Sequence, residues 1–386
     1  MNIFAKVYFK FTIYFLNMSI RYPVYMPEFQ GNEKKYVNDC LDSTWISSRG
    51  KYVSAFEEHF ANYIGIENAT SVNNGTVALH VALLALGIGP GDEVIVPTLT
   101  YIASVNPIKY VGATPVFAEC DKTYWQIDPE DVKRKINPKT KAVIIVHLYG
   151  HPCPMDELVE ICTQNKIFLI EDCAESLGST YKGKHTGTFG DIATFSFFGN
   201  KTITTGEGGM VVSNNKSTID KVANLKNQGI SSRIQYWHDC IGYNYRMTNI
   251  CAAIGLAQLE HIHPIIEQKT RVANTYKSLF QNSEIHIQPQ HPDTFHSYWM
   301  CSFLLPQNID RDSMRSYLEE SGIESRPVFY PVHTMQVYSE YVNGMRFQNS
   351  DEISKRGITL PSYPSLSNND IAFIANKVLD YIKQHE

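Results

Sequence analysis

Short apolar runs alternate with helical patterns along much of the chain, and this alternation restricts the possible folds more than any other feature. Runs rich in β-branched or aromatic residues, each bounded by turn residues, predict strands at 93–97, 114–119, 141–150, 166–172, 192–198 and 208–214. Helical patterns such as TVALHVALLALG and MDELVEICTQN lie between several of them. Nearly continuous apolar strands joined by helices indicate a mostly parallel sheet covered on both faces. The expected fold class is α/β.

The pattern changes after residue 248, and the change suggests a second domain. A helix-rich stretch with a break or kink at Pro264 is followed by mixed strand and helix patterns up to a terminal helix. A chain of 386 residues also exceeds one ordinary domain. We therefore expect a large domain over 18–264 and a smaller C-terminal α+β domain over 265–386.

The first 17 residues are aromatic and apolar, but Lys10 interrupts them and no small-residue cleavage site follows. We interpret residues 1–17 as an N-terminal extension ahead of an ordinary start at Met18. A weak membrane-surface anchor is the alternative.

Composition excludes several function classes. The formal net charge is −5, which argues against a nucleic-acid partner, and no apolar stretch has the length of a membrane span. The eight cysteines form no CxxC pair, and we expect reduced thiols in a cytoplasmic protein. His147 and His151 fall at a strand end and loop, and His261 and His263 are two apart on a helix, so no metal is expected.

Common nucleotide-binding motifs fail as well. The glycines of GIGPG follow a helix and precede a strand, which reverses the order of a dinucleotide-binding turn. In GNKTITTGEGG the lysine does not follow the second glycine, as a P-loop requires.

A different set of residues is more informative. Gly75 and Thr76 precede a predicted helix, whose N-terminus can bind an anion, although an ordinary helix cap would look the same. Asp172 ends a predicted parallel strand and so faces the ligand crevice, unless it only caps a helix or sits in a solvated turn. Lys201 follows the strand that contains Ser196 and is either a solvated charge or a buried, nucleophilic amine. Together they offer pyridoxal 5'-phosphate (PLP) an anion site, a carboxylate for its ring nitrogen and an amine for its aldehyde.

From about residue 20 to the C-terminus, the chain resembles the DegT/DnrJ/EryC1/StrS nucleotide-sugar aminotransferases. The motifs are WISSRGKYVSAFE, NNGTVALHVALLALGIGPGDEVIVPTLTYIASVN, FLIEDCAE, GDIATFSFFGNKTITTGEGGMVV, YNYRMTNICAAIGLAQLE and SRPVFYPVHT. This resemblance implies an aspartate-aminotransferase-like fold (PLP fold type I) with PLP as cofactor.

The resemblance also implies residue roles. Lys201 matches the lysine that binds the cofactor aldehyde, and Asp172 matches the partner of the ring nitrogen. Tyr101 matches the aromatic residue that stacks on the ring, although a core tyrosine would fit the sequence equally well. The full set of implied cofactor residues is Gly75, Thr76, Tyr101, Asp172, Glu175, Ser196, Lys201 and Asn249.

Glu175 departs from the family pattern, because most relatives have Gln near the ring hydroxyl. Asn249 matches a residue donated to the phosphate of the neighbouring subunit, which implies a homodimer with shared active sites. On the substrate side, an arginine suits a diphosphate and aromatic residues suit a base or sugar. We expect that side to include Trp45, Ser47, Arg246, Arg326, Tyr330 and His333.

The implied reaction transfers an amino group from L-glutamate to C4 of a nucleotide-linked 4-keto-6-deoxy sugar. The expected substrate is GDP-4-keto-6-deoxymannose, giving GDP-perosamine for O-antigen polysaccharide. UDP- or dTDP-4-keto-6-deoxyglucose is the first alternative, and a non-catalytic PLP-binding regulator is the second. Dehydratase relatives carry His at the lysine position, whereas this chain keeps Lys201.

Overall fold

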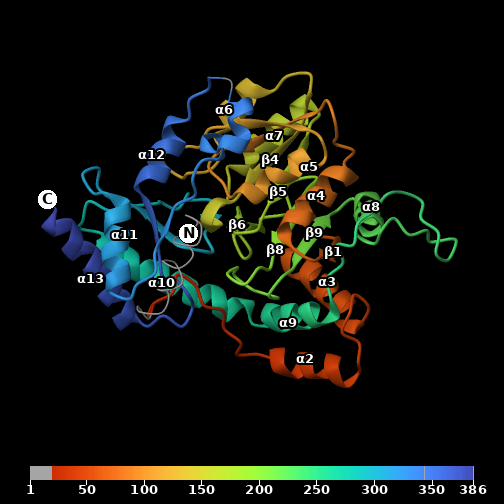
Figure 1. The fold of residues 1–386 in the computed structure, drawn as a ribbon, viewed down its shortest axis with the longest axis horizontal. Coiled ribbons are helices and arrows are strands. Elements are labelled where there is room, and N and C mark those ends of the chain that lie inside the picture. The colour runs from red at the N-terminus through yellow and green to blue at the C-terminus, as the bar shows by residue number, and fades with distance from the viewer. Residues whose placement is uncertain (1–19, 343, 386) are drawn as a thin grey trace, which may run out of the picture.

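The computed structural model describes residues 20–342 and 344–385, so the predicted extension at 1–17 lies outside the described residues (Figure 1). A seven-stranded sheet forms the centre of the large domain. Strand β9 runs antiparallel to both its neighbours, and the other strands of this sheet share one direction. The α/β prediction is confirmed. The strand order is β1 (Asn68–Val72), β9 (Gly209–Ser213), β8 (Ile192–Ser196), β5 (Phe168–Asp172), β4 (Thr140–Val146), β2 (Glu93–Pro97) and β3 (Thr114–Ala118).

Each of the six predicted strands of this sheet is present, and several end earlier than predicted. The run 141–150 leaves the sheet after Val146 and continues as a short 3-10 turn, Leu148–Gly150. Strand β1 was not predicted, because its sequence NATSV is too polar to produce an apolar pattern. Its pairing with β9 comes from the tertiary fold.

Helices cover both faces of the sheet, so the large domain has three layers (Figure 1). Apolar side chains of the strands alternate between the two faces. Val96 and Ile144, for example, belong to the core on one face, and Ile95 and Ile145 to the core on the other. The first face packs against α4 (Gly75–Ala85), α5 (Asn106–Tyr110) and α8 (Lys216–Lys226). The opposite face packs against α3 (Lys51–Ile64), α6 (Pro129–Lys135), α7 (Met155–Asn165) and α9 (Asn249–Glu260).

The C-terminal part has its own antiparallel sheet and its own core. Its strand order is β10 (His286–Ile287), β12 (Cys301–Leu304), β14 (Gly357–Leu360) and β13 (Arg326–Pro327). Strand β13 is only two residues long, since Pro327 and Pro331 have no N–H to donate to a ladder. The remaining elements include α2 (Glu33–Asp42), α10 (Ile262–Phe280), α11 (Arg311–Glu320), α12 (Gln348–Arg356), α13 (Asn368–Gln384) and the small sheet of β11 (Thr294–Phe295), β6 (Thr180–Tyr181) and β7 (Lys184–His185).

Helix α10 connects the two cores. The chain breaks between α9 and α10 at His261, and Pro264 lies in the first turn of α10, where its missing N–H costs little. Ile262, Ile265 and Ile266 belong to the core that also includes α3 and α9. The C-terminal core contains Val272, Ala273, Tyr276 and Phe280. We propose that the two domains meet within this helix. Among the described residues, no helix combines the length and apolarity that crossing a membrane requires.

Candidate active site

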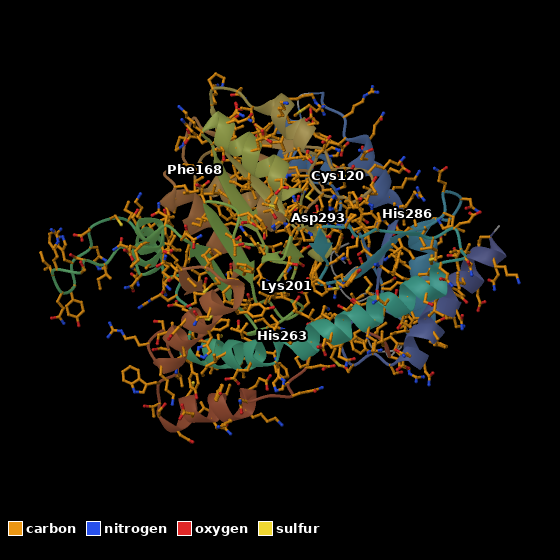
Figure 2. The ribbon with its side chains drawn as sticks, turned by 180° about the vertical axis from the view of Figure 1, so that it is seen from behind. Cys120, Phe168, Lys201, His263, His286 and Asp293 are labelled. Atoms are coloured by element: carbon orange, nitrogen blue, oxygen red, sulfur yellow. The ribbon has the colours of Figure 1, made fainter. Side chains whose placement is uncertain are left out.

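The groups predicted to bind PLP gather at the carboxyl edge of the parallel strands. Asp172 is the last residue of β5, and Ser196 is the last residue of the adjacent β8. Lys201 follows β8 by five residues, and Figure 2 places it in the middle of the molecule. Strand ends of a parallel sheet face one crevice, which explains why these separated residues converge.

Asp172 is held in a buried and oriented position. Its Oδ2 accepts a hydrogen bond from Ser104 Oγ at 2.8 Å, and its Oδ1 accepts one from the Ala174 N–H at 3.0 Å. Burial raises the pKa of this carboxyl, and the hydrogen bond from Ser104 opposes that rise. A cationic partner, such as a protonated ring nitrogen, would compensate the cost of burying the charged carboxylate.

Lys201 lies between a carboxylate and an indole ring. Its Nζ is 3.9 Å from Glu175 Oε1 and 3.8 Å from the centroid of the Trp299 ring. The side chain is largely buried, and burial lowers the pKa of the amine while the negative charges of Glu175 and Asp172 oppose the shift. A lowered pKa increases the neutral, nucleophilic fraction of the amine at neutral pH.

Glu175 is fully enclosed beside this lysine. Its Oε2 accepts the backbone N–H of Tyr149 at 2.7 Å, which directs the other carboxylate oxygen towards Lys201. Burial raises the pKa of Glu175 to about 7, although the positive charge of Lys201 acts in the opposite direction. This carboxyl can therefore exchange a proton near neutral pH.

An anion site lies at the N-terminus of α4. Asn74 caps the helix, with its Oδ1 accepting the Val77 N–H at 3.0 Å, and Gly75 and Thr76 begin the helix. A Cβ on Gly75 would lie only 2.8 Å from the Cβ of Ser196, so the two residues form one close turn. Helix N-termini and hydroxyl groups bind phosphate.

Two buried polar atoms next to this turn support that assignment. Arg246 forms an isolated β-bridge with Val72, and Val72 lies three residues before Gly75. Within the described residues, Arg246 Nε and Asn73 Oδ1 have no hydrogen-bond partner. An unsatisfied guanidinium donor beside a helix N-terminus fits a phosphorylated ligand. The residues present therefore fit PLP.

Apart from Tyr101, the sequence did not predict the aromatic wall of this site. Trp299 and Tyr149 stack with ring centroids 6.0 Å apart, and Tyr149 and Phe329 stack at 5.3 Å. Tyr101 extends this wall, with its ring centroid 5.6 Å from that of Phe329. More than half of the Tyr101 surface is exposed. Trp299 and Phe329 come from the C-terminal part, and neither was among the predicted site residues. Ser104 was missed as well, because a lone serine carries no motif.

The side-chain amide of Asn249 makes hydrogen bonds within its own chain. Its amide Nδ2 donates to the carbonyl of Trp45 at 2.7 Å and to Cys40 Sγ, and its Oδ1 accepts the Tyr52 N–H at 3.0 Å. These contacts occupy the amide within its own chain. They anchor the loop that precedes α3, and the expected contact with the phosphate of a neighbouring subunit stays a prediction.

The predicted substrate residues have varied environments. Trp45 and Ser47 lie on the exposed loop that Asn249 anchors. Arg326 is half-exposed and pairs with Glu324 at 3.0 Å, while Tyr330 is exposed. His333 is largely buried, with Thr98 Oγ1 at 2.7 Å and Asp351 Oδ1 at 3.3 Å from its two ring nitrogens. Both ring nitrogens thus have partners within the chain, and the expected contact of His333 with the substrate stays a prediction.

A further buried cluster supports the strand ends. His147 Nε2 lies 3.1 Å from Glu171 Oε2, and Cys173 is close by, an arrangement that resembles a metal site. Glu171, however, also accepts the backbone N–H groups of Gly187, Phe189 and Gly190. With four donors the carboxylate is satisfied without an ion, and it connects β5 to β4 and to the loop before β8.

Comparison with known proteins agrees with this geometry. The model of the DegT/DnrJ/EryC1/StrS aminotransferase family matches residues 27–379, and the chain belongs to this family. It is a PLP-dependent aminotransferase by fold and family.

Particular relatives are similar over nearly the whole chain. GDP-perosamine synthase of Escherichia coli O157:H7 is 56% identical, covering 93% of this chain and 98% of the relative. GDP-perosamine synthase of Vibrio cholerae is 53% identical, with the same coverage of 93% and 98%. The Streptococcus pneumoniae protein Spr1654, solved in its PLP form, superposes with a TM-score of 0.89 at 27% identity and covers 94% of this chain and 99% of its own.

The close turn at Gly75 yields a first prediction. Gly75→Ala places a methyl group against Ser196, and such overpacking costs about 1–3 kcal/mol. We expect PLP to bind more weakly by that amount, as measured by titrating apoprotein with PLP and following visible absorbance. Gly89→Ala is the matched control, because its added Cβ meets nothing closer than 3.8 Å. Equal affinity for PLP in both variants would contradict a phosphate site at this turn.

Glu175 yields a second prediction, for the protein without cofactor. A carboxyl whose folded pKa is raised from 4.5 to about 7 contributes stability below pH 4.5 and loses it as the pH rises through 7. Glu175→Gln removes this loss. Relative to wild type, we expect the free energy of unfolding of the variant to increase by up to about 3 kcal/mol between pH 4.5 and pH 8.

Urea denaturation across that pH range measures the difference. Glu207→Gln, at an exposed position of the loop after Lys201, should show no comparable pH-dependent gain. A Glu175→Gln difference that stays constant with pH would mean that the carboxyl does not titrate near neutrality.

Proposed function

We propose that this enzyme transfers the amino group of L-glutamate to C4 of GDP-4-keto-6-deoxymannose and so produces GDP-perosamine. The observation that carries the proposal is the similarity to a relative named GDP-perosamine synthase, which is 56% identical over 98% of the relative's length. Retention of Lys201 and Asp172 in one buried site supports catalysis over a purely regulatory role. The product would serve O-antigen and lipopolysaccharide synthesis from the cytoplasm.

When bound, PLP supplies an electron sink and a carrier for the amino group. The Lys201 amine would hold the cofactor aldehyde, and its Nζ would be the group that takes the proton from Cα of glutamate. The Asp172 carboxylate would keep the ring nitrogen protonated. Gly75, Thr76 and Ser196 would bind the phosphate, and Tyr101 would cover the ring.

Arg246 is the best-supported contact on the substrate side. It lies beside the phosphate turn and has an unpaired buried Nε within the described residues. Tyr101, Phe329 and Tyr330 add exposed or half-exposed aromatic surface that can stack on a base or sugar. Trp45, Ser47 and Arg326 remain proposed contacts with the nucleotide.

A substrate panel tests this function. Purified protein is incubated with glutamate and GDP-, UDP-, dTDP- or CDP-linked 4-keto-6-deoxy sugars, and mass spectrometry detects the amino sugar. We expect turnover with GDP-4-keto-6-deoxymannose and, with Lys201→Ala, no turnover despite a folded protein. Preference for a UDP- or dTDP-linked sugar would favour a viosamine-type product instead. Absence of turnover with every sugar would favour the regulator.

We also propose a homodimer, with segment 231–242, called the arm, as its contact. The arm projects from the body of the protein after α8 (Figure 1). Four large apolar residues on it are 55–88% exposed, namely Ile234, Tyr236, Trp237 and Ile241. Exposed apolar surface of this kind is typical of an interface. The arm's base adjoins the phosphate turn, since the Asn73 N–H donates to the Tyr245 carbonyl at 2.9 Å, so a second chain bound here would lie close to the site.

Removing apolar surface from the arm should separate the dimer. Light scattering should show twice the 43.8 kDa chain mass for wild type, and a shift towards the single-chain mass for the double variant Trp237→Ser, Ile241→Ser. Val337→Ser is the control, because Val337 is 70% exposed but lies outside the arm. A wild-type monomer would rule out the shared-site dimer, and a dimeric arm variant would place the contact elsewhere.

A further inference from the structure

Lys269 on α10 is a buried lysine that the reaction above does not use. Only 1% of it is exposed, and within the described residues it forms no ion pair. Its Nζ donates to the carbonyls of Trp299 at 3.1 Å and Ser362 at 3.4 Å. The Tyr25 ring lies on another side, with its centroid 5.0 Å from Nζ. Burying an ammonium group without a carboxylate is costly, so its placement calls for an explanation.

The partners of Lys269 are also partners of the catalytic loop. The Trp299 ring lies against Lys201 Nζ, and its Nε1–H donates to the Asn200 carbonyl at 2.8 Å. The Tyr25 hydroxyl donates to the Lys201 carbonyl at 2.6 Å. Lys269 thus contacts both residues that hold Lys201, one at its amine and one at its backbone.

The position of Lys269 on α10 also connects it to the catalytic lysine. Lys269 lies between Ile266, which packs in the core that includes α3 and α9, and Val272, which packs in the C-terminal core. Trp299 precedes β12 of the C-terminal sheet, whereas Asn200 and Lys201 belong to the large domain. A contact at this point can fix the C-terminal indole relative to the catalytic amine.

We propose that Lys269 is a positioning residue for Lys201. Held between two carbonyls and an aromatic face, its ammonium group fixes the Trp299 backbone and the Tyr25 ring, which in turn orient the catalytic lysine. The kinetic part of the test rests on the proposed aminotransferase reaction, whereas the spectroscopic part requires only bound PLP.

The charged and titratable groups around Lys269 are few. Glu28 acts on it from the N-terminal segment and Cys301 from β12, and Tyr25 faces it directly. Burial lowers the pKa of Lys269 to about 8, and burial raises the pKa of Cys301 to about 11, so the thiol is neutral where the lysine titrates. Lys269 therefore stays mostly protonated at pH 7.

Two substitutions distinguish the hydrogen bonds that Lys269 donates from the space that its side chain fills. Lys269→Met fills the space but leaves both carbonyls without a donor. Lys269→Gln retains two N–H donors in an uncharged group. Lys277→Met is the matched control, since Lys277 lies on the same helix and donates to the Tyr298 hydroxyl at 2.6 Å, next to Trp299 but without a contact to its carbonyl.

The experiment uses the PLP-loaded enzymes. A pH titration of cofactor absorbance reports the proton on the Lys201 nitrogen. We expect Lys269→Met to lower its midpoint by about one pH unit, because a displaced indole no longer stabilises the cation. Stopped-flow mixing with glutamate should show a rate constant lowered about tenfold, which corresponds to about 1.4 kcal/mol, with little change in the half-saturating glutamate concentration.

Lys269→Gln should recover most of both quantities, and Lys277→Met should match wild type. A wild-type titration midpoint in Lys269→Met would overturn the proposal, as would equal shifts in Lys269→Met and Lys277→Met. Failure of Lys269→Gln to recover would also overturn it, because the donors would then not be what matters. If glutamate leaves the cofactor spectrum of wild type unchanged, the proposed reaction fails, and the absorbance titration still decides the role of Lys269.

Discussion

Asp172 on β5 pairs with Thr194 on the parallel strand β8, two residues before Ser196, and the cofactor site depends on this pairing. Parallel pairing places the carboxyl ends of both strands at one edge, so the carboxylate and the phosphate-side hydroxyl are set by the same ladder. Strand β9 then approaches so closely that a Cβ on Gly209 would lie 2.6 Å from the Asn74 carbonyl. That approach holds the N-terminus of α4 against the strand end.

Burial sets the chemistry of the ionisable groups in this site. It raises the pKa values of Asp172 and Glu175 and lowers that of Lys201, so each group is shifted towards its neutral form. A lysine shifted in this way is a better nucleophile. Glu175 adds a second carboxylate beside the lysine, and this carboxylate partly restores the positive charge that burial disfavours.

The C-terminal part contributes side chains to the site. Trp299 supplies the ring against Lys201, and Phe329 extends the aromatic wall to Tyr101. Hydrogen bonds hold both residues, Trp299 through Asn200 and Lys269, and Phe329 through the Tyr149 hydroxyl. Helix α10 joins the two cores without a flexible linker, so the position of one part constrains the other.

Local pattern and motif were enough to predict the α/β class, the central strands apart from β1, and the roles proposed for Lys201, Asp172, Gly75 and Ser196. Strand periodicity and helix starts are encoded by neighbouring residues, and the motifs around these four are continuous in sequence. Contacts between distant segments carry no such local signal. Tertiary structure alone placed Trp299 and Ser104 in the site, enclosed Asn249 and His333 in hydrogen bonds within the chain, and buried Lys269 between two carbonyls. Whether a polar side chain meets a ligand or a neighbouring backbone depends on which segments pack together, and packing is decided only when the whole chain folds.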